Sequence, residues 1–434
     1  MSGTGGTAPE AVAGREWDAV VIGGGPAGAT AATLVAARGH AVLLLEKAPG
    51  TRLKVGESLM PATYWTLERL GMLERMRASA FPRKYSVQFF APDGRASSPF
   101  YFFETDPADS SQTWQVLRSD FDGLLLDNAA ERGVAVRFGS PVEEVLFEGE
   151  GEAARAVGVR AALDGGPARE IAARVVIDAS GQGALLARRL GLRDVDPRLR
   201  HAAYWRHFRG ARRDPGIDEG ATLVMRTRSP RNWFWFIPLP DDRVSVGVVG
   251  PVEGLVDGGD PEAVFAREVE RCPALAERLA GAEALFPVRV AKDYSYLSSR
   301  IGGNGWVLAG DAFGFLDPLY SSGVFLALES GAMAADAAAR GLESGVLSAA
   351  VLGAHGERYA DGIRAIRRLV YAFYDPEFSF RGFLDRYPEH RGGVVDLLTG
   401  NVFRKPYAAT LAALDEYSAE LAAAGAARAG GARG

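Results

Sequence analysis

The feature that most constrains this chain is a glycine turn between a short apolar strand and an alanine-rich helix. Residues 18–22 predict a buried parallel strand, and residues 29–38 predict a helix that ends at Gly39. In the turn between them, Gly23-x-Gly25-x-x-Gly28, the glycines permit a tight bend, close approach of a pyrophosphate and close helix–strand packing. The next strand, 41–45, leads into an acidic residue 18 positions past Gly28, where a carboxylate accepts hydrogen bonds from a ribose. We therefore predict a βαβ unit that binds a dinucleotide through Gly23, Gly25, Gly28, Glu46 and the adjacent Lys47; a glycine turn that serves packing alone is the simpler alternative.

Composition narrows the class of protein. The chain has 434 residues, 47% apolar and 24% charged, as expected for one large globular unit or two joined domains. The net charge of −5 and the isoelectric point near 5.7 disfavour nucleic acid as a partner. One cysteine, Cys272, cannot form an internal disulfide or a metal cluster, so we expect no metal site and a reducing, cytoplasmic compartment. We see no signal peptide and no run of about 18 uninterrupted apolar residues, so we expect no membrane partner.

The order of predicted elements indicates an α/β fold in which the nucleotide-binding pieces are interrupted by a second layer. We expect residues 1–14 to be a disordered lead-in and 421–434 a flexible tail. Residues 15–345 should form the nucleotide-binding domain, with a strand-rich layer interleaved at about 80–115 and 200–290. Residues 346–420 have a helical pattern and should cover the substrate pocket.

Three further segments show a resemblance to the FAD-dependent monooxygenase superfamily. They are a buried strand that ends in Gly310-Asp311, the segment 115–122 with Arg118, and the segment 176–181 with Asp178. The resemblance implies that Asp311 hydrogen-bonds the ribityl chain, that Arg118 approaches the flavin and that Asp178 belongs to a third element on the nucleotide side. It also implies a Rossmann-like FAD-binding fold of the GR2 type, with a second β-sheet layer for the substrate and a helical C-terminal region. No second glycine fingerprint is visible, so we infer that a separate NAD(P)H-dependent flavin reductase supplies the electrons.

Within that superfamily, four segments resemble the flavin-dependent halogenases. Residues 55–61 resemble the loop that covers the flavin, 81–85 the segment with the catalytic lysine, 315–323 the FxDPxxSSG segment beside the isoalloxazine, and Trp233-x-Trp235-x-Ile237-Pro238 the WxWxIP signature. The pattern is most similar to the smaller halogenases that act on phenols or on carrier-tethered pyrroles and phenols. It implies an enzyme of secondary metabolism, such as antibiotic biosynthesis, that uses FADH2, oxygen and chloride or bromide to halogenate an electron-rich aromatic.

By this resemblance, Lys84 is the candidate relay for hypohalous acid. Its ammonium would polarise the acid by hydrogen bonding, or its neutral amine would become a chloramine. We predict that Lys84 enters a strand and shares one face with Ser86 and Gln88. Lys54 also adjoins a motif, but its place before the 55–61 loop indicates a loop or phosphate-side charge. A solvated surface charge is the simpler interpretation of any single lysine.

The remaining candidates surround the flavin and the substrate. Trp233 and Trp235 should point to one side of a strand, either as a wall that keeps substrate from the flavin or as core packing. Ser322 and Gly323 begin a helix, whose N–H groups suit a halide, and Ser321 is a candidate catalytic residue; simple helix capping is the alternative. Asp293 lies in a segment that aligns near the flavin ring, where it could tune or bond to the cofactor or serve as a strand-end hydrogen-bonding residue.

The substrate class follows from one departure. Tryptophan halogenases carry a glutamate that assists ring deprotonation where this chain has Tyr320, so the resemblance favours a phenol or pyrrole, free or carrier-bound, over an indole. We expect the aromatic-rich stretch 367–403, with Phe373 and Tyr374, to cover the pocket beside Lys84; core packing competes with this role. An FAD hydroxylase or epoxidase is the alternative function, and a flavin-binding protein without turnover is a third. A homodimer is compatible with the sequence.

Overall fold

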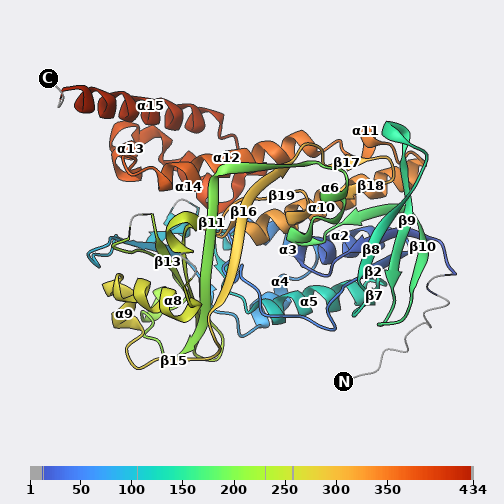
Figure 1. Ribbon diagram of the computed structural model, residues 1–434, viewed down its shortest axis with the longest axis horizontal. Coiled ribbons are helices and arrows are strands. Elements are labelled where there is room, and N and C mark those ends of the chain that lie inside the picture. Colours follow the sequence, from blue (N-terminus) through green and yellow to red (C-terminus); the bar gives the residue numbers. More distant parts are fainter. Residues whose placement is uncertain (1–11, 13, 105, 230, 257–258, 432–434) are drawn as a thin grey trace.

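The computed structural model describes residues 12, 14–104, 106–229, 231–256 and 259–431. Two large sheets form its framework, with the nucleotide-side sheet to the right in Figure 1 and the substrate-side sheet to the left. Helices of the C-terminal region run along the top of both (Figure 1). The predicted α/β fold with a second sheet and a helical C-terminal region is therefore confirmed.

The nucleotide-side sheet has eight strands, and its central strands are parallel because helical crossovers connect them. Its path runs β17 (Gly302–Gly303), β18 (Trp306–Leu308), β10 (Ala168–Asp178), β1 (Trp17–Ile22), β2 (Val42–Leu45) and β7 (Ala135–Arg137). An antiparallel extension of β8 (Val142–Glu148) and β9 (Arg155–Ala162) continues from β10. The predicted glycine turn joins β1 to α2 (Pro26–Ala36) at the carboxyl edge of this sheet.

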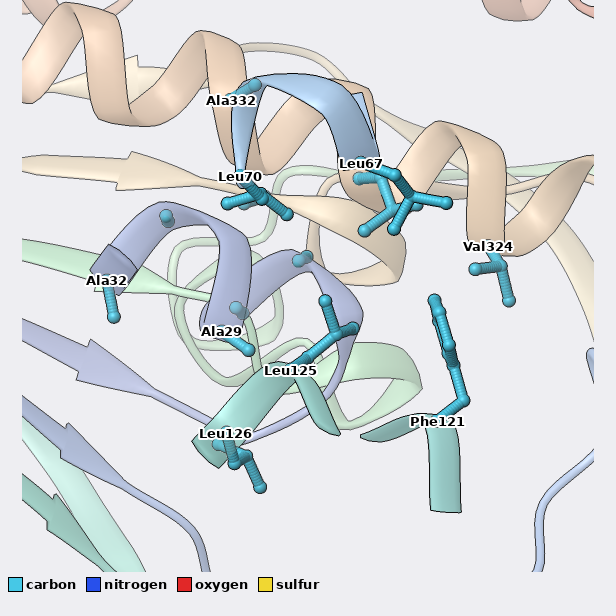
Figure 2. Packing of buried hydrophobic residues seen from close by; sticks show 14 of the residues in the cluster. Ala29, Ala32, Leu67, Leu70, Phe121, Leu125, Leu126, Val324 and Ala332 are labelled. Atoms are coloured by element: carbon cyan, nitrogen blue, oxygen red, sulfur yellow. The ribbon is translucent and has the colours of Figure 1, made fainter. Parts of the chain in front are cut away.

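Four helices join in one layer beside this sheet through small and apolar side chains. They are α2, α3 (Thr63–Arg69), α5 (Arg118–Glu131) and α10 (Ser322–Ser344). Three of them contact its strands, and α3 packs on α10. Figure 2 shows side chains from all four in one buried cluster, namely Ala29, Ala32, Leu67, Leu70, Phe121, Leu125, Leu126, Val324 and Ala332. Alanines on α2 and α10 let these two helices approach closely, and this contact fixes the start of α10 relative to the glycine turn.

The substrate-side sheet has nine strands and is largely antiparallel. Its path runs β19 (Gly314–Phe315), β16 (Arg289–Ser298), β11 (Arg193–Arg209), β14 (Arg243–Pro251), β13 (Trp233–Leu239), β12 (Thr222–Arg226), β4 (Ser86–Phe90) and β5 (Phe100–Tyr101). A short strand, β15 (Glu283–Ala284), pairs with β11. In Figure 1 the long strand β11 runs from below the C-terminal helices down toward β15. One face of this sheet packs toward the nucleotide side, and the other contacts α7 (Val252–Leu255), α8 (Pro261–Glu270) and α9 (Pro273–Arg278).

Smaller elements complete the fold. A two-stranded sheet joins β3 (Arg83–Lys84) to β6 (Thr113–Trp114), and the short helices are α4 (Leu73–Ala78), α6 (Leu185–Arg189) and α11 (Ala349–Leu352). The C-terminal region consists of α12 (Gly356–Tyr374), α13 (Phe380–Arg386), α14 (Arg391–Thr399) and α15 (Ala408–Gly431). Among the described residues, no helix combines the length and the apolar character that a membrane span needs.

Three local expectations are wrong. The stretch 421–431, predicted to be a flexible tail, continues α15, because its alanines favour helix more than its glycines disfavour it. Of the predicted disordered lead-in, residues 1–11 and 13 lie outside the described residues, but Val12 is buried and its carbonyl accepts a hydrogen bond from the indole of Trp17. The strand predicted through Lys84 is broken at Tyr85: Lys84 pairs with Thr113 in the small sheet, while Ser86 begins β4 in the large one.

Candidate active site

The glycine turn has the geometry that a bound dinucleotide needs. Gly23 has φ +102°, and a Cβ there would lie 2.4 Å from the carbonyl oxygen of Ala179. A Cβ on Gly28 would lie 1.9 Å from the carbonyl oxygen of Gly23, so this position must be glycine for α2 to pack on the turn. At Gly25 a Cβ would meet nothing within 4 Å, so the helix start is open to a ligand.

Glu46 closes the second strand next to this turn. Its carboxylate accepts hydrogen bonds from the backbone N–H of Gly24, at 2.8 Å, and of Ala48, at 2.9 Å. A pocket beside it is lined by Gly24, Glu46, Gly50, Thr51, Arg52, Lys54, Asp122, Leu126 and Phe138. Burial lowers the pKa of Lys54 in this pocket, whereas Lys47 is exposed. The structure thus places Lys54 in the lining of this pocket, and the assignment of the adjacent Lys47 to the cofactor stays a prediction.

The 55–61 loop is fixed on the nucleotide side by Arg118, the first residue of α5. The buried guanidinium donates to both carboxylate oxygens of Asp122, at 2.9 and 3.0 Å, and to the carbonyl of Val55 at 2.7 Å. Such a bidentate pair is rigid. The predicted flavin-side arginine therefore also holds the start of the loop.

The other predicted flavin-side acids differ in their surroundings. Asp311 lies half-buried in a short 3-10 turn after β18, beside Gly310, whose φ is +62°. The buried carboxylate of Asp178 accepts hydrogen bonds from the backbone N–H of Ser180, at 3.0 Å, and of Leu186, at 2.8 Å, so it shapes the loop after β10. The backbone of Asp293 pairs in β16, but its side chain lies outside the described part of the chain.

Lys84 is buried, with only 2% of its surface exposed. Its Nζ donates to Ser58 Oγ and to the carbonyl of Leu59, each at 2.9 Å, and lies 5.5 Å from the ring centroid of Phe102. Burial lowers the pKa of Lys84 to about 7, because removal from water disfavours the ammonium form. The amine is therefore held by the 55–61 loop and is present in both protonation states near neutral pH.

The same loop contacts the substrate-side sheet through a buried ionisable pair. Glu57 Oε1 and His207 Nε2 lie 3.0 Å apart, out of line for a hydrogen bond, and each residue is 1% exposed. The imidazole of His207 packs near the rings of Trp205 and Phe286, at 5.7 and 5.0 Å between centroids. Glu57 and Ser58 thus connect the loop to this sheet and to Lys84.

Trp233 and Trp235 point to one side of β13, as predicted, and both belong to the core that faces the nucleotide side. Their ring centroids are 6.4 Å apart. The indole of Trp235 lies over Gly247 and donates to Ser245 Oγ at 3.1 Å. Ile237 shares their face and Pro238 continues the buried strand. The two indoles therefore form a continuous buried surface between the layers.

Trp233 also connects to the end of α12. Its indole N–H donates to the hydroxyl of Tyr374 at 2.9 Å, and this hydroxyl lies 3.4 Å from both carboxylate oxygens of Asp317. His201 Nδ1 lies 2.8 Å from the same carboxylate, and its ring packs against that of Tyr374 at a tilt of 32°, with centroids 4.3 Å apart. Burial raises the pKa of Tyr374 well above its usual range, so this hydroxyl remains protonated.

The other two predicted pocket aromatics flank that network. Phe373 lies edge-on to Trp233 and Tyr320, at 6.1 and 6.4 Å, and the Arg226 guanidinium lies 4.3 Å from its ring. The hydroxyl of Tyr320 donates to the carbonyl of Leu369 at 3.3 Å. Only Phe373 and Tyr374 of the 367–403 aromatics reach the paired indoles. Phe378, Phe380 and Phe383 pack among the C-terminal helices instead.

The predicted halide residues open α10. Ser321 adopts the left-handed conformation, with φ +58°, directly before the helix, and its side chain makes no capping hydrogen bond. Ser322 is buried, and a Cβ on Gly323 would meet nothing within 4 Å. The first turn of α10 is therefore open at Gly323, and its backbone N–H groups favour an anion.

Sequence reasoning missed the residues that join the loops to the sheets. These are Glu57, Ser58, Gln115, His201, His207, Thr222 and Arg226, all buried or half-buried. Their partners are distant along the chain, as in Glu57 with His207, so periodicity gives no sign of them. Two signals were available: Glu57, Ser58 and Gln115 lie inside segments that resemble family motifs, and two of the five histidines lie on one apolar strand.

Comparison with known proteins identifies the class. A model described as an FAD binding domain matches residues 16–338. The open cradle at Gly25 and the glycines that no Cβ could replace fit such a cofactor. The chain is therefore an FAD-dependent enzyme.

Its relatives identify the family. The chlorinase of 1H-pyrrole-2-carbonyl peptidyl-carrier protein from Pseudomonas fluorescens is 31% identical over 412 residues, 90% of each chain. The flavin-dependent brominase Bmp2 superposes with a TM-score of 0.82 at 29% identity, covering 94% of this chain and all of that one. The myxobacterial chondrochloren halogenase CndH superposes with a TM-score of 0.76 at 34% identity, covering 90% of this chain and 92% of that one. The chain belongs to the flavin-dependent halogenases, which confirms the predicted family and disfavours the hydroxylase alternative.

Proposed function

We propose that this halogenase passes hypohalous acid through Lys84 to a phenol or a pyrrole. When reduced FAD is bound, it and oxygen together supply the oxidising power that converts chloride or bromide into hypohalous acid. The observation that carries the proposal is the environment of Lys84, which is 2% exposed, has a pKa of about 7 and is held by the 55–61 loop.

The amine has two ways to activate the acid. As an ammonium, Lys84 donates a proton to the oxygen of the hypohalous acid. This oxygen then leaves as water while the ring carbon takes the halogen. As a neutral amine it takes the halogen itself, releases water, and then transfers the halogen to the ring. In both routes the ring loses one proton to restore aromaticity. A pKa of about 7 keeps both forms available.

The residues around the amine would restrict where the oxidant goes. The buried surface of Trp233 and Trp235 lies between the layers. This position supports the proposal that the two indoles form a wall that keeps the substrate from the flavin. The open first turn of α10 at Ser322 and Gly323 supports a halide site, with Ser321 at its edge. Gly23, Gly25, Gly28, Glu46, Arg118 and Asp311 would hold the FAD.

The substrate class depends on the site rather than on overall similarity. Relatives of comparable identity include the carrier-protein chlorinase and a tryptophan 2-halogenase from Chondromyces crocatus, 34% identical over 322 residues. Tyr320, whose hydroxyl has its pKa raised by burial, supplies no base for an indole ring. A phenol or pyrrole loses the proton from its own OH or NH, so we favour these substrates, free or on a carrier protein, with a separate reductase for the flavin.

The test is replacement of Lys84. Lys84→Ala should bind FAD and consume reduced flavin and oxygen, yet give no halogenated product. Mass spectrometry of phenols and carrier-bound pyrroles, incubated with a flavin reductase and chloride or bromide, measures this. Lys405→Ala removes an exposed lysine paired with Asp396, at 2.8 Å, and should keep activity. Undiminished halogenation by Lys84→Ala would refute the relay.

A further inference from the structure

The amine of Lys84 is positioned by one side chain and one backbone group, both from the 55–61 loop. Ser58 Oγ and the carbonyl oxygen of Leu59 each accept a hydrogen bond from Nζ at 2.9 Å. A neutral amine has two N–H donors and one lone pair, whereas an ammonium has three donors. The two acceptors therefore match the donors of the neutral form and leave its lone pair uncommitted.

Ser58 is itself held from the opposite side. Its Oγ lies 2.8 Å from Thr222 Oγ1 on β12, and Gln115 Nε2 donates to that threonine oxygen at 2.8 Å. Gln115 Nε2 also donates to the carbonyl of Gly220 at 2.8 Å. Ser58, Gln115 and Thr222 are all at most 4% exposed. The buried chain Gln115–Thr222–Ser58–Lys84 thus connects the large sheet to the amine.

The loop that carries Ser58 is fixed at further points. Its start is tied to the nucleotide side by the hydrogen bond from Arg118 to the carbonyl of Val55, at 2.7 Å. Glu57, next to Ser58, contacts His207 at 3.0 Å. The 55–61 loop is therefore held by contacts to both layers, and these contacts fix the place of Ser58. A residue that positions another side chain must itself be held in this way.

We propose that Ser58 is the positioning residue of Lys84, fixing the direction of the amine through the Gln115–Thr222–Ser58 chain. This inference rests on the proposed relay and assigns to the 55–61 loop a second role, that of orienting the amine. Ser58 contacts the amine and need not contact substrate. Its loss should misdirect the halogen rather than prevent its formation.

The first experiment measures the amine directly. The chain has five lysines, so lysine labelled with carbon-13 at Cε gives a spectrum that single Lys→Arg variants can assign. An ammonium gains more from a hydrogen-bond acceptor than a neutral amine does, so Ser58→Ala should lower the titration midpoint of Lys84 by roughly 0.5 to 1 pH unit. Ser58→Thr, which keeps the hydroxyl, should restore the wild-type midpoint.

Ser86→Ala is the matched control. Ser86 is equally buried, follows the break at Tyr85 in the same stretch of chain, and donates to Asp218 at 3.1 Å rather than to the lysine. It should leave the midpoint unchanged. If Ser58→Ala does not fold, Thr222→Val removes the next member of the chain and should lower the midpoint by a smaller amount.

The second experiment measures how much oxidant reaches product. Normalised to the flavin that each protein oxidises, Ser58→Ala should give about 10- to 100-fold less halogenated product than the wild type, since misplacement by 1 Å can cost that much. A midpoint and a product yield equal to those of Ser86→Ala would overturn the positioning role while leaving the relay intact. Full halogenation by Lys84→Ala would instead refute the relay, whatever Ser58→Ala does.

Discussion

Burial of Lys84 makes the stability of this protein depend on pH in a way that one substitution should abolish. The pKa of Lys84 is lowered from 10.5 to about 7 in the folded chain. Between these values the unfolded chain binds one more proton at this site than the folded chain does, so stability rises with pH. Below about pH 7 both states are protonated, and the folded state bears the full cost of the buried charge.

The size of the effect follows from the linkage relation. From pH 7 to pH 9, the Lys84 contribution to the free energy of unfolding should become more favourable by about 2 kcal/mol. Lys84→Met removes the titrating group from both states, so the wild type should gain about 2 kcal/mol relative to Lys84→Met over this range. At pH 7, Lys84→Met should be the more stable protein, because it buries no charge.

The assay is chemical or thermal unfolding of both proteins at pH 7, 8 and 9. The quantity compared is the difference between their free energies of unfolding at each pH. Taking the difference removes the contribution of other titrating groups. Lys405→Met deletes an exposed lysine, so its free energy of unfolding should change with pH in parallel with that of the wild type. If the wild type and Lys84→Met also give parallel curves, the amine is solvated in the folded state and the argument from its burial is wrong.

Two further changes test other parts of the site. Gly28→Ala should abolish FAD binding, measured by flavin absorbance after gel filtration, because its Cβ would lie 1.9 Å from the carbonyl oxygen of Gly23; full FAD occupancy would contradict the packing argument. Glu57→Gln should lower the free energy of unfolding by about 1–3 kcal/mol, since it leaves buried His207 without its carboxylate. Glu253→Gln, at an exposed ion pair, should change stability by under about 1 kcal/mol, and an equal effect of the two variants would count against the buried pair.

The sequence predicts those parts of the fold in which each residue's role is local. Gly23 and Gly28 are required by contacts within the first βα turn, and the apolar runs of β1 and β10 identify buried parallel strands. The helices α8 and α9 were missed within a region expected to be strand-rich, although each begins with a proline, at Pro261 and Pro273, as helix starts often do. Alternating apolar residues nearby outweighed that signal.

The site is predictable only as far as the family motifs extend. Lys84, Trp233 and Trp235 are found by resemblance, but the burial that lowers the pKa of Lys84 depends on residues from separate elements. Ser58 was visible as part of a motif, yet its bond to the lysine requires the break at Tyr85 that places Lys84 in the small sheet. Such contacts depend on the packing of two layers, which no local pattern encodes.

Strand β11 shows how that packing holds the site together. His201 and His207 are six residues apart, so their side chains lie on the same face of the strand. Six residues of a strand span about 20 Å, which is the distance along β11 between the two. Each contacts a buried carboxylate, Asp317 from the 315–323 segment at 2.8 Å and Glu57 from the 55–61 loop at 3.0 Å. One rigid strand therefore fixes the distance between the segment that opens α10 and the loop that holds Lys84. Under the proposed relay, the oxidant is made near the first segment and used near the second, so a change in this distance would displace the amine from the oxidant.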